Sequence, residues 1–311
     1  MRRQARPGCR TYLASDAPIV ASLEAALAFE PSALLVGVAP PGGALPPDWR
    51  ATIRAAIEAG LDIVSGLHQI LGEDVEFAAA AVARGTAIVD VRVPPPPHLF
   101  GGKASGIPSF VSLTVGSDCA VGKMTASLEL TRAASAAGRD ARFLATGQTG
   151  ILIAGSGVPV DRTISDFTSG AVEELVLANA DAELLFVEGQ GAINHPAFAA
   201  VTLGLLYGAA PDALILVHLA TRTHMDDYGT PLLSLPRLIE LYEDLCATVK
   251  PARVTGIALN TYGLDDERAR RAIDDAAALT GLPCDDVVRF GPQALYAAMA
   301  PNLRIKTEVL A

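Results

Sequence analysis

A loop that contains glycines and a lysine offers the clearest chemistry in the sequence. Residues 111–125 have the pattern of a β-strand, a turn with Gly116 and Gly122, and a helix that begins near Lys123. A helix N-terminus presents unpaired amide donors and a partial positive charge, to which the lysine adds a full charge. The segment therefore predicts a phosphate-binding loop. Its expected contact residues are Gly116, Ser117, Asp118, Ala120, Val121, Gly122, Lys123, Met124 and Thr125.

The spacing of this loop differs from the standard Gly-x-x-x-x-Gly-Lys-Ser/Thr pattern. Ser117 stands where the first glycine belongs, and Met124 replaces the hydroxyl residue that usually binds Mg²⁺. Thr125 comes one residue later, about 100° further around the helix. The loop therefore predicts phosphate binding, and we predict no metal site. The alternative is a glycine-containing turn that only closes a βα unit.

A carboxylate is expected close to the loop. Glu188 ends an apolar stretch and is followed by Gly189 and Gly191, a pattern that places an acid at the carboxyl edge of a parallel sheet, where ligands bind. Glu188 could instead cap the following helix. His195 and His224 are two further candidates for proton transfer, although a histidine after a glycine turn is often only a structural hydrogen-bonding residue.

Short β-type stretches alternate with alanine-rich helical stretches along nearly the whole chain, which predicts an α/β fold with mainly parallel sheets. In the first third we expect strands at 33–38, 61–64 and 87–91 and helices at 48–59 and 74–84. Later strands are expected at 110–115, 141–145, 184–188, 213–218 and 254–260, with helices beginning at 122, at 166 or 167, near 235 and at 265.

The sequence predicts two domains. Residues 92–109 contain four consecutive prolines and several glycines, a composition typical of a stiff linker. This places a first domain at residues 1–91 and a second at 110–311. A chain of 311 residues is long enough for both to have their own cores.

Composition excludes several classes of protein. Half of the residues are hydrophobic and the net charge is −10, which disfavours disorder and nucleic-acid binding. We see no membrane-spanning apolar run and no secretory signal, so we expect a cytoplasmic protein. The apolar composition is compatible with a homo-oligomer. The scattered cysteines, Cys9, Cys119, Cys246 and Cys284, predict neither a disulfide nor a zinc site.

The segment from Gly116 to Lys123, together with the Glu188-Gly-Gln-Gly191 element, resembles two motifs of dethiobiotin synthetases, which are ATP-using enzymes. This resemblance implies that Asn260, at the end of an expected strand, holds an adenine base; an ordinary Asx-turn is the alternative. It also implies an ATP-dependent ligase or kinase with Lys123, Asp118 and Glu188 around Mg²⁺.

A longer series of motifs is similar to the D-glutamate N-acetyltransferase family. It comprises the Gly-Lys-Met-Thr variant of the loop and residues 38–43, 60–68, 188–191, 195–196, 202–206, 222–224 and 256–260. The resemblance implies a small N-terminal Rossmann-like domain, a C-terminal P-loop-like domain, and transfer of an acetyl group from acetyl-CoA to the amino group of D-glutamate.

Two catalytic hypotheses and one non-catalytic hypothesis follow. In an acetyltransferase, the loop would hold the coenzyme phosphates, a base chosen from Glu188, His195 and His224 would deprotonate the amine, and Arg222 would bind a substrate carboxylate. Gln148 and Thr149, in a glycine-rich turn, would line the pocket for this small amino acid substrate. The alternatives are the ATP- and Mg²⁺-dependent ligase and a nucleotide-binding regulator without catalysis.

Overall fold

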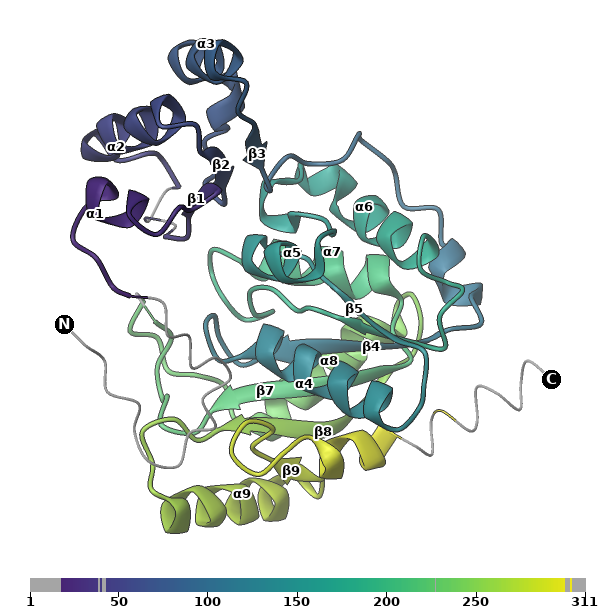
Figure 1. Ribbon diagram of the computed structural model, residues 1–311. Coiled ribbons are helices and arrows are strands. Elements are labelled where there is room, and N and C mark those ends of the chain that lie inside the picture. Colours follow the sequence, from purple (N-terminus) through teal and green to yellow (C-terminus); the bar gives the residue numbers. More distant parts are fainter. Residues whose placement is uncertain (1–17, 39, 41–42, 227, 300–302, 304–311) are drawn as a thin grey trace.

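The computed structural model describes residues 18–38, 40, 43–226, 228–299 and 303 (Figure 1). Two parallel sheets lie in separate parts of this structure, so the predicted α/β class is confirmed. Among the described residues, Cys119, Cys246 and Cys284 are free thiols, whereas Cys9 lies outside them. None of the helices in these ranges is long and apolar enough to cross a bilayer.

The first part of the chain forms a three-stranded parallel sheet in the order β1-β2-β3. Asp74 precedes α3 and accepts hydrogen bonds from the amides of Glu76 and Phe77, while Gly85 ends the helix in the left-handed conformation. These caps explain why the helix predicted at 74–84 forms almost as expected. The elements are α1 Leu23–Leu27, β1 Ala33–Val36, α2 Pro47–Glu58, β2 Asp62–Ser65, η1 Leu71–Glu73, α3 Val75–Arg84 and β3 Ile88–Asp90.

The second part contains a six-stranded parallel sheet in the order β5-β6-β4-β7-β8-β9. Its strands are β4 Phe110–Gly116, β5 Ala141–Leu144, β6 Leu184–Val187, β7 Ala213–Leu219, β8 Arg253–Asn260 and β9 Cys284–Asp285. Its helices are α4 Lys123–Ala136, α5 Gln148–Ala154, η3 Val160–Arg162, α6 Ser165–Leu177, α7 Ala199–Ala209, α8 Leu235–Ala247 and α9 Asp266–Thr280.

The larger sheet is covered on both faces. One core cluster joins the sheet to residues of α6, α7 and α8, including the fully buried Tyr242, and a second joins it to residues of α4, including Leu130. Burial on both faces explains why β6 is apolar along its whole length and why every residue of β4 is buried.

The central position of β4 determines what surrounds the predicted phosphate loop. β4 pairs with β6 through Leu113 and Val187, and with β7 through Gly116 and Val217. The residues that follow these partners, Glu188 and His218, therefore lie at the same carboxyl edge as the loop that follows β4.

Two segments differ from the sequence-based expectation. The stretch 146–150 is not only a turn, because α5 begins at Gln148. The predicted linker also packs against the larger domain over its second half, in the helix η2 Lys103–Gly106. There the buried carboxylate of Glu173, in α6, accepts hydrogen bonds from the amides of Gly101, at 2.5 Å, and Ala104, at 3.1 Å. Proline content predicts a stiff linker, but it could not show this attachment.

We predict that Gly170→Ala destabilises the fold. A Cβ atom at Gly170 in α6 would lie 1.9 Å from the carbonyl oxygen of His98 in the linker. We expect this clash to outweigh the gain in helix propensity and to reduce the free energy of unfolding by about 1–3 kcal/mol in chemical denaturation. The control is Gly106→Ala, where an added Cβ meets nothing within 4 Å. Equal stability of both variants would contradict the proposed packing.

Candidate active site

The loop between β4 and α4 curls around the amino group of Lys123. Gly122 precedes the helix with a φ of 112°, and Ala120 also has a positive φ, of 53°. The Lys123 Nζ atom donates a hydrogen bond to the carbonyl oxygen of Asp118 at 2.8 Å. A Cβ at Gly116 would lie 2.9 Å from Nζ, so the lysine side chain needs a glycine at the end of β4. The predicted strand, turn and helix are therefore present, and the lysine amino group lies inside the turn.

Lys123 is held in an unusual environment for an ammonium group. Its exposed fraction is only 7%. Burial lowers its pKa to about 8, against the opposing influence of Cys119, Asp118 and Glu188. The positive charge is thus costly in this position, and an anionic ligand would stabilise it.

Glu188 follows β6 at the same carboxyl edge of the sheet as the lysine, and it is 5% exposed. Its Oε2 atom accepts hydrogen bonds from the amides of Thr146, at 2.9 Å, and Gly147, at 3.2 Å. A Cβ at Gly150 would lie 2.2 Å from the same oxygen, so α5 can approach the carboxylate only with glycine there. Burial raises the pKa of Glu188 to about 7, although the two amides and Lys123 oppose this shift. A carboxyl group with this pKa can accept and return a proton at neutral pH.

Asp118 connects the loop to the segment after β7. Its buried Oδ2 atom accepts hydrogen bonds from Arg222 Nη1, at 2.9 Å, and from the Asp226 amide, at 3.0 Å. Burial opposes ionisation of Asp118, but the Asp226 amide and then Arg222 outweigh it and lower its pKa. Arg222 also donates to the carbonyl oxygen of Cys119 at 3.1 Å. The arginine predicted to bind substrate thus holds the phosphate loop in this structure.

His195 is 2% exposed and lies beside the same aspartate, with Nε2 3.9 Å from Asp118 Oδ1. Its Nδ1 atom accepts a hydrogen bond from the Ala197 amide at 3.2 Å, so a neutral ring carries its proton on Nε2. The ring stacks on Phe198 and meets the edge of Tyr228. In this arrangement the nitrogen that faces Asp118 is a donor, which favours a positioning role over that of a base.

Asp118, Cys119 and His195 also bring three possible metal-binding atoms within 4.8 Å of one another. The chemistry of this set does not fit a cation well. Arg222 already pairs with the carboxylate, and the His195 Nδ1 atom already accepts a hydrogen bond from the Ala197 amide. We therefore assign these contacts to loop positioning.

The remaining predicted residues fall into different places. Gln148 contacts the first domain, because a Cβ at Gly66 would lie 3.1 Å from its Cγ atom, while Thr149 is exposed. His224 is exposed and hydrogen-bonds to the neighbouring Thr223. Met124 and Thr125 are half-buried in the first turn of α4.

Two residues at the loop were missed as functional candidates. His218 Nδ1 lies 2.8 Å from the Ser117 hydroxyl, and pairing of β7 with β4 could have suggested this contact. The Tyr242 hydroxyl donates to the Gly116 carbonyl at 2.7 Å and accepts from the Ile193 amide at 3.0 Å. Tyr242 thus ties the phosphate loop to the segment of His195. No signal in the sequence marks it, because it lies on the apolar face of α8.

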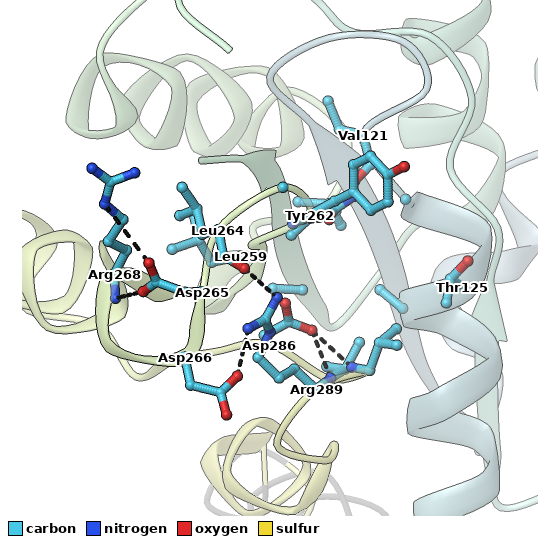
Figure 2. Close-up of a pocket in the computed structure, with 18 residues that line it drawn as sticks. Val121, Thr125, Leu259, Tyr262, Leu264, Asp265, Asp266, Arg268, Asp286 and Arg289 are labelled. Atoms are coloured by element: carbon cyan, nitrogen blue, oxygen red, sulfur yellow. Dashed lines mark hydrogen bonds and ion pairs between the residues drawn. The ribbon is translucent and has the colours of Figure 1, made fainter. Parts of the chain in front are cut away.

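A pocket of about 780 Å³ opens beside the start of α4, within the size range of small-molecule sites (Figure 2). Its lining includes Gly122, Thr125 and Asn260, and the exposed ring of Tyr262 stands at its edge. Asn260 Nδ2 donates to the Val121 carbonyl at 3.0 Å, and its Oδ1 accepts from the Tyr262 amide. Asn260 therefore lies at the predicted place and also makes the Asx-turn considered as the alternative.

The fold and the site define a two-domain protein of the P-loop class. The central strand of a parallel sheet leads into a lysine-containing anion loop, and an acid follows the neighbouring strand. Family models agree with this class: a Rossmann-like domain of unknown function, DUF1611_N, matches residues 4–94, and a P-loop domain, DUF1611_C, matches residues 98–296. The chain belongs to the DUF1611 family.

Three relatives cover most of the chain. A D-glutamate N-acetyltransferase of Tritonibacter scottomollicae is 39% identical over 94% of this chain and 88% of its own length. One from Pseudoalteromonas sp is 40% identical over 85% and 80%, respectively. The crystal structure of a DUF1611 family protein from Anabaena variabilis has 42% identity and a TM-score of 0.88, covering 91% of this chain and 84% of that chain. The protein is accordingly an enzyme of the N-acetyltransferase class.

We predict that Tyr242→Phe lowers the stability of the protein, although the aromatic ring still fills its place in the core. The variant removes the hydroxyl that serves Gly116 and Ile193 and leaves both buried backbone groups without this partner. We expect the free energy of unfolding to fall by about 1–3 kcal/mol in urea denaturation. The matched control is Tyr207→Phe, which loses only an exposed contact with Thr248. A Tyr242 variant as stable as this control would show that the hydroxyl does not anchor the loop.

Proposed function

We propose that this enzyme transfers an acetyl group from acetyl-CoA to the amino group of an acidic amino acid, with D-glutamate as the acceptor. One observation carries the proposal: a loop that surrounds the Lys123 amino group and a carboxyl group with a pKa of about 7 lie at the same sheet edge. We take D-glutamate as the acceptor because both curated relatives are named D-glutamate N-acetyltransferases.

The residues present fit the phosphate and adenosine portions of coenzyme A. Lys123 and the amides at the start of α4 would hold the diphosphate, replacing the Asp118 carbonyl as the partner of the ammonium group. The pocket lined by Thr125, Asn260 and Tyr262 adjoins this loop and would hold the adenine. Its volume of about 780 Å³ is ample for that portion of the coenzyme.

Acetyl-CoA supplies an activated acetyl thioester, and the protein must supply a neutral amine. Glu188 is placed to accept a proton from the acceptor ammonium, because both of its amide partners donate to Oε2 rather than to Oε1. The amino nitrogen then forms a C–N bond to the acetyl carbon while the C–S bond breaks. The nitrogen loses its second proton as the amide forms. Of the two protons, one passes through Glu188 to the departing thiolate and the other goes to solvent, which balances the step.

The other candidates receive different roles. Gln148 fits the acceptor side, since it begins α5 next to Glu188 and contacts the first domain. Arg222 and His195 position Asp118 and the loop, and we assign no proton transfer to the exposed His224. The arginine on Asp118 and the methionine after Lys123 also make an ATP- and Mg²⁺-dependent ligase less suitable than the acetyltransferase.

The test is an assay of free thiol release from acetyl-CoA with a panel of D- and L-amino acids. We expect release to depend on an acidic amino acid, with D-glutamate the best acceptor, and mass spectrometry to show an N-acetyl product. A parallel reaction with ATP and Mg²⁺ follows ADP. Amino-acid-dependent ADP formation without thiol release would overturn the proposal.

We predict that Lys123→Met weakens binding of coenzyme A by about 10- to 150-fold, because a charge-assisted contact to phosphate is worth about 1.5–3 kcal/mol. The measurement is isothermal titration calorimetry. Lys103→Met, at an exposed position in η2, is the control and should bind normally. Unchanged affinity of the Lys123 variant would remove the lysine from the coenzyme site.

We predict that Glu188→Gln lowers kcat by about 10²- to 10⁴-fold while the fold is retained. In the unmodified enzyme, kcat/KM should rise as the pH passes through about 7, because Glu188 accepts a proton only when ionised. It should fall above about 8, where Lys123 loses the charge that holds phosphate.

Glu240→Gln, on the exposed face of α8, is the control and should keep the full pH profile. A Glu188→Gln enzyme with normal turnover and an unchanged acidic limb would exclude Glu188 as the base.

A further inference from the structure

A buried arginine joins the carboxyl edge of the small sheet to the larger domain. Arg92 follows β3 and is 4% exposed, and His68 follows β2 at the same edge. The Arg92 Nη1 atom forms an ion pair with Asp161 in η3 and lies 2.6 Å from His68 Nε2. Arg162 donates to the Arg92 carbonyl at 3.3 Å. Four polar side chains from two domains thus converge at one point.

Two atoms of this cluster lack the partners that buried polar groups normally have. The Nε–H donor of Arg92 and the Oδ1 acceptor of Asp161 are both buried without a hydrogen bond. Each such group costs about 1–3 kcal/mol, so its presence requires an explanation. A free donor beside a free carboxylate oxygen is complementary to a molecule that carries both a carboxylate and an ammonium group.

His68 occupies the place that a ligand carboxylate would take. Burial and then the charge of Arg92 lower the pKa of His68, so the ring acts as a neutral acceptor for the guanidinium. A carboxylate is a stronger acceptor for arginine than a neutral imidazole. The side chains of His68 and Asp161 are 38% and 26% exposed, so the cluster is open on their side.

The cluster lies close to the proposed base. The amide of Val158 donates to the Ala145 carbonyl at 3.0 Å, and that of Val160 donates to the Thr146 carbonyl at 3.1 Å. Thr146 in turn donates its amide to Glu188. Asp161 directly follows Val160. It therefore lies next to the Thr146 segment, which holds the Glu188 carboxylate. In Figure 1 the small domain lies above α5, whose first residue, Gln148, contacts Gly66 at the end of β2.

The charges favour an acidic amino acid. Arg92 and Arg162 against Asp161 give two positive charges and one negative charge, a net charge of +1. An amino acid with two carboxylates and one ammonium group has a net charge of −1. A neutral amino acid would leave one positive charge uncompensated.

We infer that this cluster is the binding site for the acceptor amino acid, with Arg92 taking a carboxylate and Asp161 the ammonium group. The inference rests on the proposed function and places the selection of the acceptor at the contact between the Rossmann-like domain and the larger domain. Glu188 then receives the ammonium proton from the side of the larger domain. Gln148 lies between the two parts of the site.

Steady-state kinetics of Arg92→Met test the inference. We expect KM for D-glutamate to rise by 50-fold or more, with KM for acetyl-CoA changed by less than twofold. The preference for D-glutamate over D-glutamine should also collapse, because the variant lacks the charge that favours a second carboxylate. Arg84→Met is the matched control, since it removes an exposed arginine before β3, at the opposite end of the strand from Arg92. Unchanged KM for D-glutamate, or equal changes in both KM values, would overturn the inference.

A second measurement does not depend on turnover or on the Arg92 variant folding. Calorimetric titration with D-glutamate alone should show binding to the unmodified enzyme and its loss in Asp161→Asn, which keeps the size of the side chain. Binding that survives this change would overturn the assignment even if acetyl transfer is confirmed. Binding that is lost would support it even if the thiol assay showed another acyl donor.

Discussion

The buried ammonium group of Lys123 is the constraint on which the rest of the site depends. A positive charge at 7% exposure requires nearby oxygen atoms, and here the Asp118 carbonyl, turned inward by the loop, supplies one. Gly122, with a φ of 112°, allows that turn, and Gly116 leaves room for the lysine side chain. The turn also places Asp118 where Arg222 and the Asp226 amide can hold its carboxylate. In the proposed function the loop is thereby prearranged for an anion, which would reduce the cost of ordering it on binding.

The same constraint links the two halves of the proposed chemistry. Glu188 stabilises the charge of Lys123, and burial raises the pKa of the Glu188 carboxyl group to about 7. The proposed anion site and the proposed base therefore lie at one edge. The small sheet directs its own carboxyl edge, with His68 and Arg92, toward Asp161 of the larger domain. The coenzyme would thus bind to the larger domain and the acceptor between the two domains, and both would meet at Glu188. This arrangement gives a physical reason why one enzyme contains two parallel sheets.

Much of this organisation could be predicted from the sequence, because it is local. The acid that caps α3, the glycine that precedes α4 and the apolar strands all act within a few residues of themselves. The sheet edge could also place Glu188 near the loop, but individual hydrogen-bond partners in distant segments could not be predicted. Arg222 looked like a free substrate-binding arginine, yet it pairs with Asp118 104 positions away. Tyr242 and Arg92 gave no signal at all, because their roles depend on partners brought together only by the sheet order and the docking of the two domains.

The most direct test of the central claim is a crystal structure of the enzyme with bound coenzyme A. The account predicts that a diphosphate oxygen lies about 3 Å from Lys123 Nζ, among the amides that begin α4, with the adenine in the pocket beside Thr125 and Asn260. A complex in which Lys123 still donates to the Asp118 carbonyl, while the diphosphate binds elsewhere on the protein, would contradict it.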